Sequence, residues 1–257
     1  MGMAYNLHGI CGIAAVMAGL MTGSIRAQEI VYEVPSGGAF IYSYITQGYE
    51  FADGAQLGGT SRYAQQMSVP VYSDISRSVT VTASLYATAP FDPSAYTTAP
   101  TQPGTTSGPV DLMQPGTPIW SSGPLTFSLA ASDPFTPSVD YLVFNNINTT
   151  LPNTVFWSVQ FNSIGSYAGG AGFGMIYRNA ADVTPVGAAT DANRFFVRNT
   201  SVSSIWSPSF LPSVPSAYTP PITSTFGVQL DAVTLPEPTT SMLSLCSAGL
   251  LFRRRRA

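Results

Sequence analysis

Side chains that commonly perform chemistry are scarce in the central part of this 257-residue chain. His8, Cys11 and Cys246 lie near the two ends, and the sequence contains no lysine. Residues 28–235 therefore lack the imidazole, thiolate and amine groups on which many nucleophilic, zinc-dependent and Schiff-base enzymes depend. They lack the cysteines for a disulfide as well. This composition predicts a domain without a zinc site or a cofactor, and it leaves open whether a loop binds calcium.

Carboxylates are the reactive groups that remain. Residues 28–235 contain twelve Asp and Glu against five Arg, a net charge of about −7, which argues against nucleic-acid binding. No EF-hand-like spacing occurs, and we interpret Asp53, Asp182 and Asp191 as loop caps. A glycosidase or polysaccharide lyase is the enzymatic alternative, and it requires two carboxyl groups about 5 to 10 Å apart in an open groove. The sequence shows no recognisable pair, so we predict a non-catalytic protein.

Aromatic side chains offer a different chemistry, which is stacking on sugar rings. Trp157 belongs to an apolar alternation and is predicted to lie in the core. Trp120 and Trp206 border proline-rich stretches, and for them burial and sugar stacking are equally open. These two tryptophans are the candidate carbohydrate-stacking residues.

Strands are the elements that would position these groups. In residues 79–86 and 155–162 apolar side chains recur at every second position, as in strands with at least one buried face. Six more strands are expected at residues 40–45, 125–129, 141–144, 172–177, 195–198 and 226–233. No amphipathic helix interrupts them. The pattern predicts an all-β fold, a single antiparallel β-sandwich of jelly-roll type.

Two proline-rich stretches interrupt this rhythm within a predicted domain of residues 28–234. Residues 90–124 contain eight prolines and residues 208–221 contain five. Proline removes a ladder donor, so we predict surface excursions rather than strands in both places. The second stretch is either a loop or a linker, and we favour a loop because residues 226–233 still look able to pair with the sheets.

The N-terminus has the outline of a secretory signal peptide, residues 1–27. An apolar run from Ile10 to Met21 is followed by a small, polar stretch that ends at Ala27, after which we predict cleavage. The alternative is a buried N-terminal helix.

The C-terminal segment, residues 235–257, has three parts in order. Pro236, Glu237 and Pro238 come first, then 14 mostly apolar residues from 239 to 252, then Arg253, Arg254, Arg255 and Arg256. As a helix the apolar part would cover about 21 Å of a hydrocarbon core about 30 Å thick, which suits a transient anchor. The arginines would stay on the cytoplasmic side and leave the Pro-Glu-Pro triplet outside.

This segment resembles the PEP-CTERM sorting signal, which a membrane protease and transpeptidase called exosortase processes in Gram-negative bacteria. A Gram-positive sortase signal is similar in plan, but "LPEPTT" lacks its Thr-Gly pair. More weakly, the β-prone phrases of residues 79–199 are similar to ectodomains found ahead of such tails.

The resemblance implies export, transient anchoring in the inner membrane, and removal of the tail. We therefore expect an exosortase-processed protein of the cell surface or extracellular matrix. Its sandwich would have a structural role or bind exopolysaccharide. The alternative remains a secreted glycosidase or polysaccharide lyase that uses carboxylates.

Overall fold

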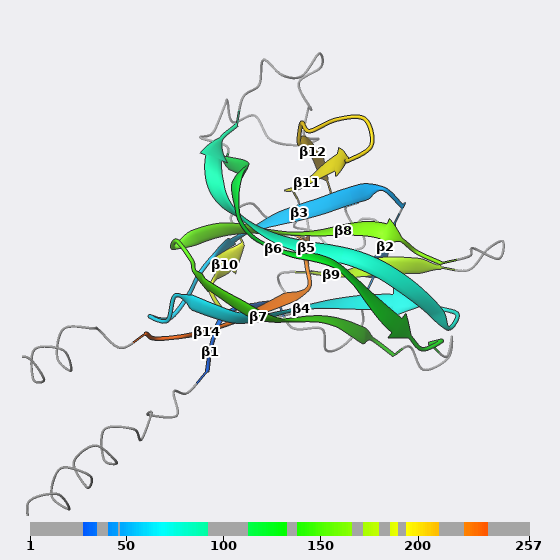
Figure 1. Cartoon of the computed structure of the whole chain (residues 1–257), viewed down its shortest axis with the longest axis horizontal. Helices are drawn as coiled ribbons and strands as arrows, with labels where there is room; N and C mark the ends of the chain where they lie inside the picture. The colour runs from blue at the N-terminus through cyan, green and yellow to red at the C-terminus, as the bar shows by residue number, and fades with distance from the viewer. Residues whose placement is uncertain are drawn as a thin grey trace, which may run out of the picture.

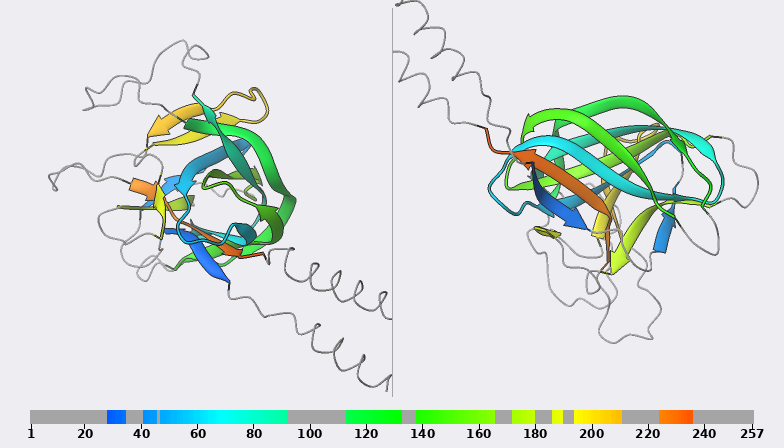
Figure 2. Two further views of the ribbon diagram at one scale, coloured as in Figure 1. Left: turned by 90° about the vertical axis from the view of Figure 1, so that its left-hand side faces the viewer. Right: turned by 90° about the horizontal axis from the view of Figure 1, so that it is seen from below.

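The computed structural model describes residues 28–34, 41–45, 47–91, 113–132, 138–165, 172–179, 186–189, 194–210 and 224–235. Within them the chain forms fourteen strands and no helix, and the strands make two antiparallel sheets that pack face to face (Figure 1, Figure 2). The predicted all-β sandwich is confirmed. It contains more strands than the eight expected from alternation.

One sheet, called sheet 1 below, runs in the order β1-β14-β4-β9-β13, with β7 paired to β4 and β2 paired to β9. Its members are β1 (Glu29–Val34), β2 (Ile41–Tyr44), β4 (Tyr63–Ser73), β7 (Asp140–Thr150), β9 (Phe173–Asn179), β13 (Ser224–Phe226) and β14 (Val228–Val233).

The second sheet, called sheet 2 below, runs in the order β12-β11-β3-β8-β5-β6, with the short β10 paired to β3. Its members are β3 (Tyr49–Gln56), β5 (Arg77–Pro90), β6 (Met113–Leu129), β8 (Thr154–Ser163), β10 (Ala188–Ala189), β11 (Arg194–Asn199) and β12 (Ser207–Phe210).

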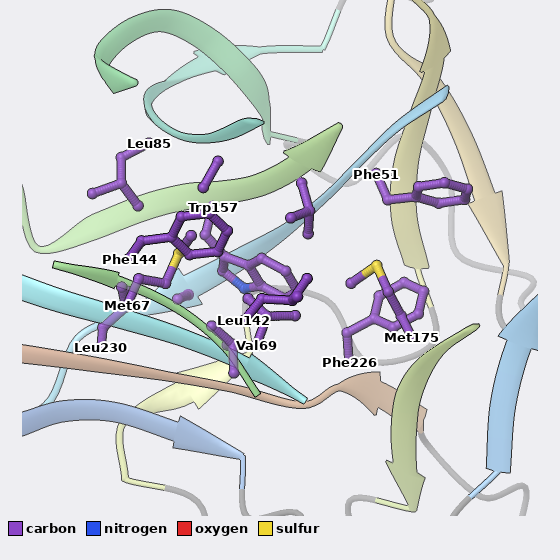
Figure 3. Close-up of a cluster of buried hydrophobic side chains, with 14 of the residues drawn as sticks. Phe51, Met67, Val69, Leu85, Leu142, Phe144, Trp157, Met175, Phe226 and Leu230 are labelled. Carbon is purple, nitrogen blue, oxygen red and sulfur yellow. The ribbon is translucent and has the colours of Figure 1, made fainter. Parts of the chain in front are cut away.

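The core lies between the sheets and is built from the alternation that the sequence shows. The apolar face of β5 is fully buried, as is the apolar face of β8 that carries Trp157 and Phe161. They meet side chains of sheet 1 such as Phe144, Met67 and Leu230 (Figure 3). The prediction that Trp157 is a core residue is confirmed. Strand β8 lies between β3 and β5, as its apolar composition suggested.

The first proline-rich stretch is partly a strand, which corrects the prediction for residues 90–124. Strand β6 begins at Met113, and Pro115, Pro118 and Pro124 all lie within its ladder with β5. Because β6 is an edge strand, it can carry prolines that a central strand would not tolerate, and register shifts in the β5–β6 ladder absorb the irregularities. Residues 92–112 lie outside the described part of the chain.

The second proline-rich stretch shows the same edge effect on a smaller scale. Pro208 belongs to β12, the opposite edge strand of sheet 2, where it pairs with Phe196 of β11. Residues 211–221 lie outside the described residues, so the choice between loop and linker stays a prediction.

Strand β4 was not expected, and its Pro70 shows why. Proline normally argues against a central strand. Along one side, β4 pairs with β14 as far as Ser68 and with β9 from Val71 onward. Pro70 lies between these two ladders, where the partner changes. Gly227 links β13 to β14 beside it, where a Cβ would lie 2.6 Å from the Pro70 ring. A glycine and a proline thus meet where the two ladders join.

The described domain begins and ends at one corner of sheet 1. Glu29 at the start of β1 pairs with Ala232 near the end of β14. The Gln28 amide donates a hydrogen bond to Asp231 over 2.8 Å, and the hydroxyls of Ser61 and Thr234 are 2.9 Å apart. The segments before residue 28 and after residue 235 therefore leave from adjacent strands.

Candidate functional site

The residues predicted to direct sorting lie outside the described part of the chain. They comprise Ala27 at the predicted signal cleavage site, the triplet Pro236, Glu237 and Pro238, and Arg253 to Arg256. The aspartates Asp182 and Asp191 also lie outside it. The structure describes the chain up to Leu235, the residue before the triplet.

The two candidate stacking residues have different environments. Trp206 is only 6% exposed, and its ring packs edge-on against Tyr86 with centroids 5.6 Å apart. On this geometry Trp206 fits the burial alternative and offers little surface to a sugar. Trp120 in β6 is half-buried and packs against the main core.

Beneath Trp206 lies a buried polar cluster on the outer face of sheet 2, formed by Glu50, Tyr86, Ser158 and Arg198. Glu50 comes from β3, Tyr86 from β5, Ser158 from β8 and Arg198 from β11. Glu50 and Arg198 are direct cross-strand partners, so strand pairing itself brings the opposite charges together.

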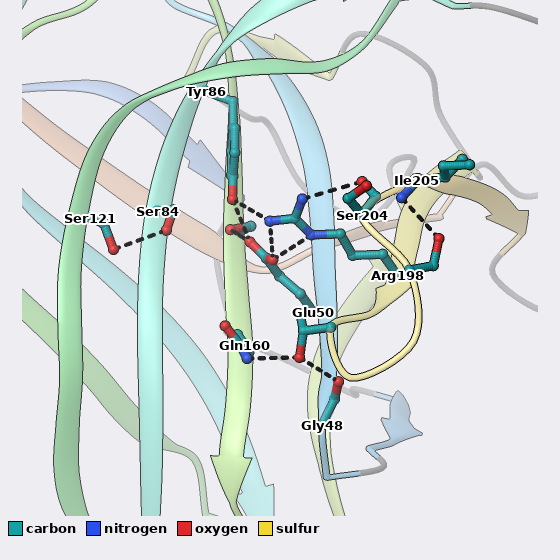
Figure 4. A network of polar contacts seen from close by, with 12 residues as sticks. Gly48, Glu50, Ser84, Tyr86, Ser121, Gln160, Arg198, Ser204 and Ile205 are labelled. Carbon is teal, nitrogen blue, oxygen red and sulfur yellow. Dashed lines mark hydrogen bonds and ion pairs between the residues drawn. The ribbon is translucent and has the colours of Figure 1, made fainter.

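The Glu50 carboxylate is fully engaged by this cluster (Figure 4). Its Oε1 accepts hydrogen bonds from the Tyr86 hydroxyl at 2.8 Å and the Ser158 hydroxyl at 2.6 Å. Its Oε2 accepts from Arg198 Nε at 2.8 Å and lies 2.7 Å from Nη2 of the same guanidinium. Arg198 also donates to the Tyr86 hydroxyl over 2.9 Å.

Aromatic rings complete the cluster. The Arg198 guanidinium lies 4.3 Å from the centroid of Trp206 and 5.8 Å from that of Tyr86, both within the range of cation–π attraction. Burial, reinforced by the negative charge of Glu50, raises the pKa of Tyr86 to about 12. The phenol therefore stays protonated at neutral pH and serves as a donor to Glu50.

This arrangement suits a structural role better than catalysis. Glu50 is 2% exposed, and its lone pairs face four donors, so little capacity is left for a substrate. The cluster ties β11 to β3, β8 and β5. Sequence reasoning did not find it, although a glutamate and an aspartate in the otherwise apolar "YEFADG" could have signalled buried carboxylates.

Asp53 corrects a second expectation, because it lies inside strand β3 and is buried rather than capping a loop. One carboxylate oxygen accepts a hydrogen bond from the Gly54 N–H at 2.7 Å. The other accepts from the Phe226 N–H of sheet 1 at 3.4 Å. Asp53 thus links the two sheets through a backbone donor.

The other described carboxylates mostly bind donors of the fold. Hydrogen bonds from Ser61 are the main cause that lowers the pKa of Glu29 below its ordinary value. Asp74 pairs with Arg77 at 3.4 Å, and Asp140 accepts from the Ala130 N–H at 2.8 Å. Within the described ranges no three His, Cys, Asp or Glu side chains gather as metal ligands would.

The outer face of sheet 1 across β1, β14, β4 and β7, which we call the open face, differs from the outer face of sheet 2, part of which the aromatic cluster covers. Residues that pair across antiparallel strands point to the same side, so register defines its members. They are Ile30 and Glu33 of β1, Gln229 and Asp231 of β14, Gln66, Ser68 and Pro70 of β4, and Tyr141, Val143 and Asn145 of β7. Most of them keep contact with solvent.

A small hollow of about 40 Å³ lies on this face, and its lining includes Glu33, Ser68, Gln229 and Tyr141. Tyr141 is 48% exposed, which makes it an accessible aromatic side chain next to polar groups. Its strand was expected from the sequence, but its exposure was not, because that depends on the neighbours of β7 in the sheet.

Glu33 and Asp231 are the two carboxylates of the open face and can be compared with the pair that the enzymatic alternative requires. They are diagonal neighbours on β1 and β14, a relation that puts Cα atoms about 7 to 8 Å apart. Asp231, however, is only 5% exposed, and its two oxygens accept hydrogen bonds from Gln28 and Gln229. It is thus shielded from a substrate, and the pair does not make an open groove.

In the part of the chain that the structure describes, no helix has the length and apolar character needed to cross a membrane. Comparison with known proteins adds no relative: no family model, no curated protein and no solved structure matches this chain.

Proposed function

We propose that this chain is an exported protein of the cell surface or extracellular matrix, matured by an exosortase, with a non-catalytic sandwich domain. One observation carries the proposal: a Pro-Glu-Pro triplet, a short apolar run and four arginines follow the last strand in that order. Signal peptidase would release the N-terminus after Ala27, and the exosortase would act at Pro236, Glu237 and Pro238.

The position of the domain ends supports this route. Only Thr234 and Leu235 separate β14 from the triplet, and β1 begins beside the end of β14. A domain exported by its N-terminus and then held by its C-terminus would face the membrane with a single corner. The rest of both sheets would stay free for contacts outside the cell.

The engagement of the described carboxylates supports a non-catalytic role. Glu50 and Asp53 are buried and bind donors within the fold, and Asp231 is shielded by two glutamines. A glycosidase needs carboxyl groups that reach the scissile bond from both sides. Release of reducing ends from a polysaccharide by the purified protein would instead establish the alternative of a secreted hydrolase.

Two variants of the sorting segment test the proposal. Glu237→Ala should block maturation but not export, because the signal peptide acts first, and full-length precursor should accumulate in the inner membrane. Replacing Arg253 to Arg256 by serine should instead let the short apolar helix slip across the membrane before it is cut. Fractionation and intact-mass measurement of each protein separate these results.

Glu33→Gln is the matched control, since it removes a carboxylate outside the sorting segment and should mature like the wild type. If the wild-type protein retains its tail to Ala257 and neither sorting variant changes location, the segment is only a weak anchor. The exosortase role is then rejected.

A further inference from the structure

We infer that the open face of sheet 1 binds an uncharged polysaccharide across strands β1, β14, β4 and β7. This inference rests on the proposed function, since it supplies an extracellular ligand for the exported domain. It moves the carbohydrate site from Trp120 and Trp206 to a different sheet.

A row of polar groups across the sheet is the first part of the argument. Glu33, Gln229 and Ser68 are successive cross-strand partners, so their side chains stand beside one another on one face. In the next row the Gln66 amide donates to the Asn145 side chain over 2.5 Å. Amides, hydroxyls and carboxylates supply both donors and acceptors, which the hydroxyl groups of a sugar require.

An exposed ring beside these groups is the second part. Tyr141 pairs with Pro70, two residues along β4 from Ser68, and borders the same hollow as Ser68 and Gln229. Aromatic rings combine an apolar surface with a polar tip and are favoured where one side of a ligand is apolar and the other is wet. A pyranose has this character, because its C–H groups and hydroxyls point in different directions.

Charge selects among the extended polymers that could lie on such a surface. Among the Asp, Glu, Lys and Arg residues, the open face as defined by its described members carries Glu33 and Asp231, both acidic. A polyanion such as nucleic acid or a uronate-rich polysaccharide would be repelled. A neutral polysaccharide encounters no such barrier.

The size of the hollow indicates how the polymer would bind. About 40 Å³ holds a water molecule or two, whereas pockets that enclose a small molecule are several times larger. The polymer would therefore lie across the face and contact it through several residues along its length. Such binding favours a long chain over a free monosaccharide.

Affinity electrophoresis of the exported protein tests the inference. Native gels would contain dextran, hydroxyethyl cellulose or galactomannan as neutral probes, and alginate as an anionic one. We expect at least one neutral polymer to retard the protein, and Tyr141→Ala to weaken that binding at least tenfold. Tyr141→Phe keeps the ring and should retain most of the binding.

Leu125→Ala is the matched control, since Leu125 is 40% exposed on β6 of the other sheet and should not affect retardation. Retardation by alginate alone, by none of the neutral polymers, or to the same extent in Tyr141→Ala overturns the inference. Thermal midpoints would show that each variant is folded. Removal of the tail is measured by intact mass, and polysaccharide binding is measured by electrophoresis. A failure of the proposed function can therefore be distinguished from a failure of the binding inference.

Discussion

Single residues in this domain acquire their roles from burial rather than from their chemical type alone. Glu50 is a carboxylate that the fold uses as an acceptor for three side chains, and Asp53 uses one oxygen to bind a backbone N–H of the facing sheet. A buried carboxylate is costly unless its lone pairs are satisfied. Both residues are therefore expected to matter for stability.

Trp157→Ala should lower the free energy of unfolding by about 3 to 5 kcal/mol, because it removes a fully buried ring from between the sheets. The ring contacts Phe226 of sheet 1 edge-on at 6.4 Å. Urea denaturation measures the loss. Trp157→Phe should cost less, since it leaves a smaller cavity and no described residue bonds the indole N–H. An unchanged midpoint for Trp157→Ala would contradict the core assignment.

The raised pKa of Tyr86 predicts that the domain loses stability at alkaline pH. Its pKa is about 12 in the folded protein against an ordinary value of 10, so the folded state retains a proton that the unfolded state releases. The stabilisation is complete below about pH 10 and is lost as pH rises toward 12. Melting midpoints of wild type and Tyr86→Phe should therefore converge over this range.

Burial raises the pKa of Tyr177 as well, so only the difference between the two proteins is diagnostic. A constant gap in midpoint from pH 9 to 12 would contradict the assignment.

At the scale of elements, the Glu50 cluster explains how β11 is held against β3, β8 and β5 of sheet 2. Strand β11 pairs with β3 and β12, and Phe196 and Trp206 cover the outer surface of β8 and β5. The aromatic cover also buries the second face of β8 at Phe156, which is nearly as buried as Trp157.

Arg198→Met should destabilise the domain by about 2 to 4 kcal/mol, because it leaves the buried Glu50 charge without its cation. This expected loss is smaller than the loss of about 3 to 5 kcal/mol that is typical of breaking a fully buried ion pair, since the Arg198 side chain is partly exposed. Denaturation by urea measures it. The double variant Glu50→Gln with Arg198→Met should recover part of the loss, because no uncompensated charge remains. A double variant less stable than Arg198→Met would contradict this account.

At the scale of the whole molecule, the two outer faces are unequal. Part of the outer face of sheet 2 is covered by its own aromatic cluster, whereas sheet 1 presents polar side chains and Tyr141 to solvent across β1, β14, β4 and β7. Both ends of the described domain lie at one corner of sheet 1, at β1 and β14. In the proposed function this corner faces the membrane during anchoring, and the open face extends away from it across the sheet.

The sequence by itself determined the all-β class and two of the core strands, β5 and β8. Alternation in β5 and β8 identified the buried faces because burial on one side of a pleated strand imposes a period of two. Composition also determined that residues 28–235 contain no histidine, cysteine or lysine. Both conclusions follow from local pattern or residue counts, which do not depend on how the strands are paired.

The tertiary structure decided what local patterns cannot encode. Strand β3 contains Glu50, Asp53 and Gly54, and its sequence does not indicate a central strand until the donors from β5, β11 and β13 are known. Strand β4 contains Pro70, which a central strand accepts only because β4 changes its ladder partner at this residue. Burial of Trp206 and exposure of Tyr141 likewise depend on which strands flank them. Strand order is a property of long-range pairing. It decides that aromatic rings cover part of the outer face of sheet 2, and that the open face of sheet 1 keeps contact with solvent.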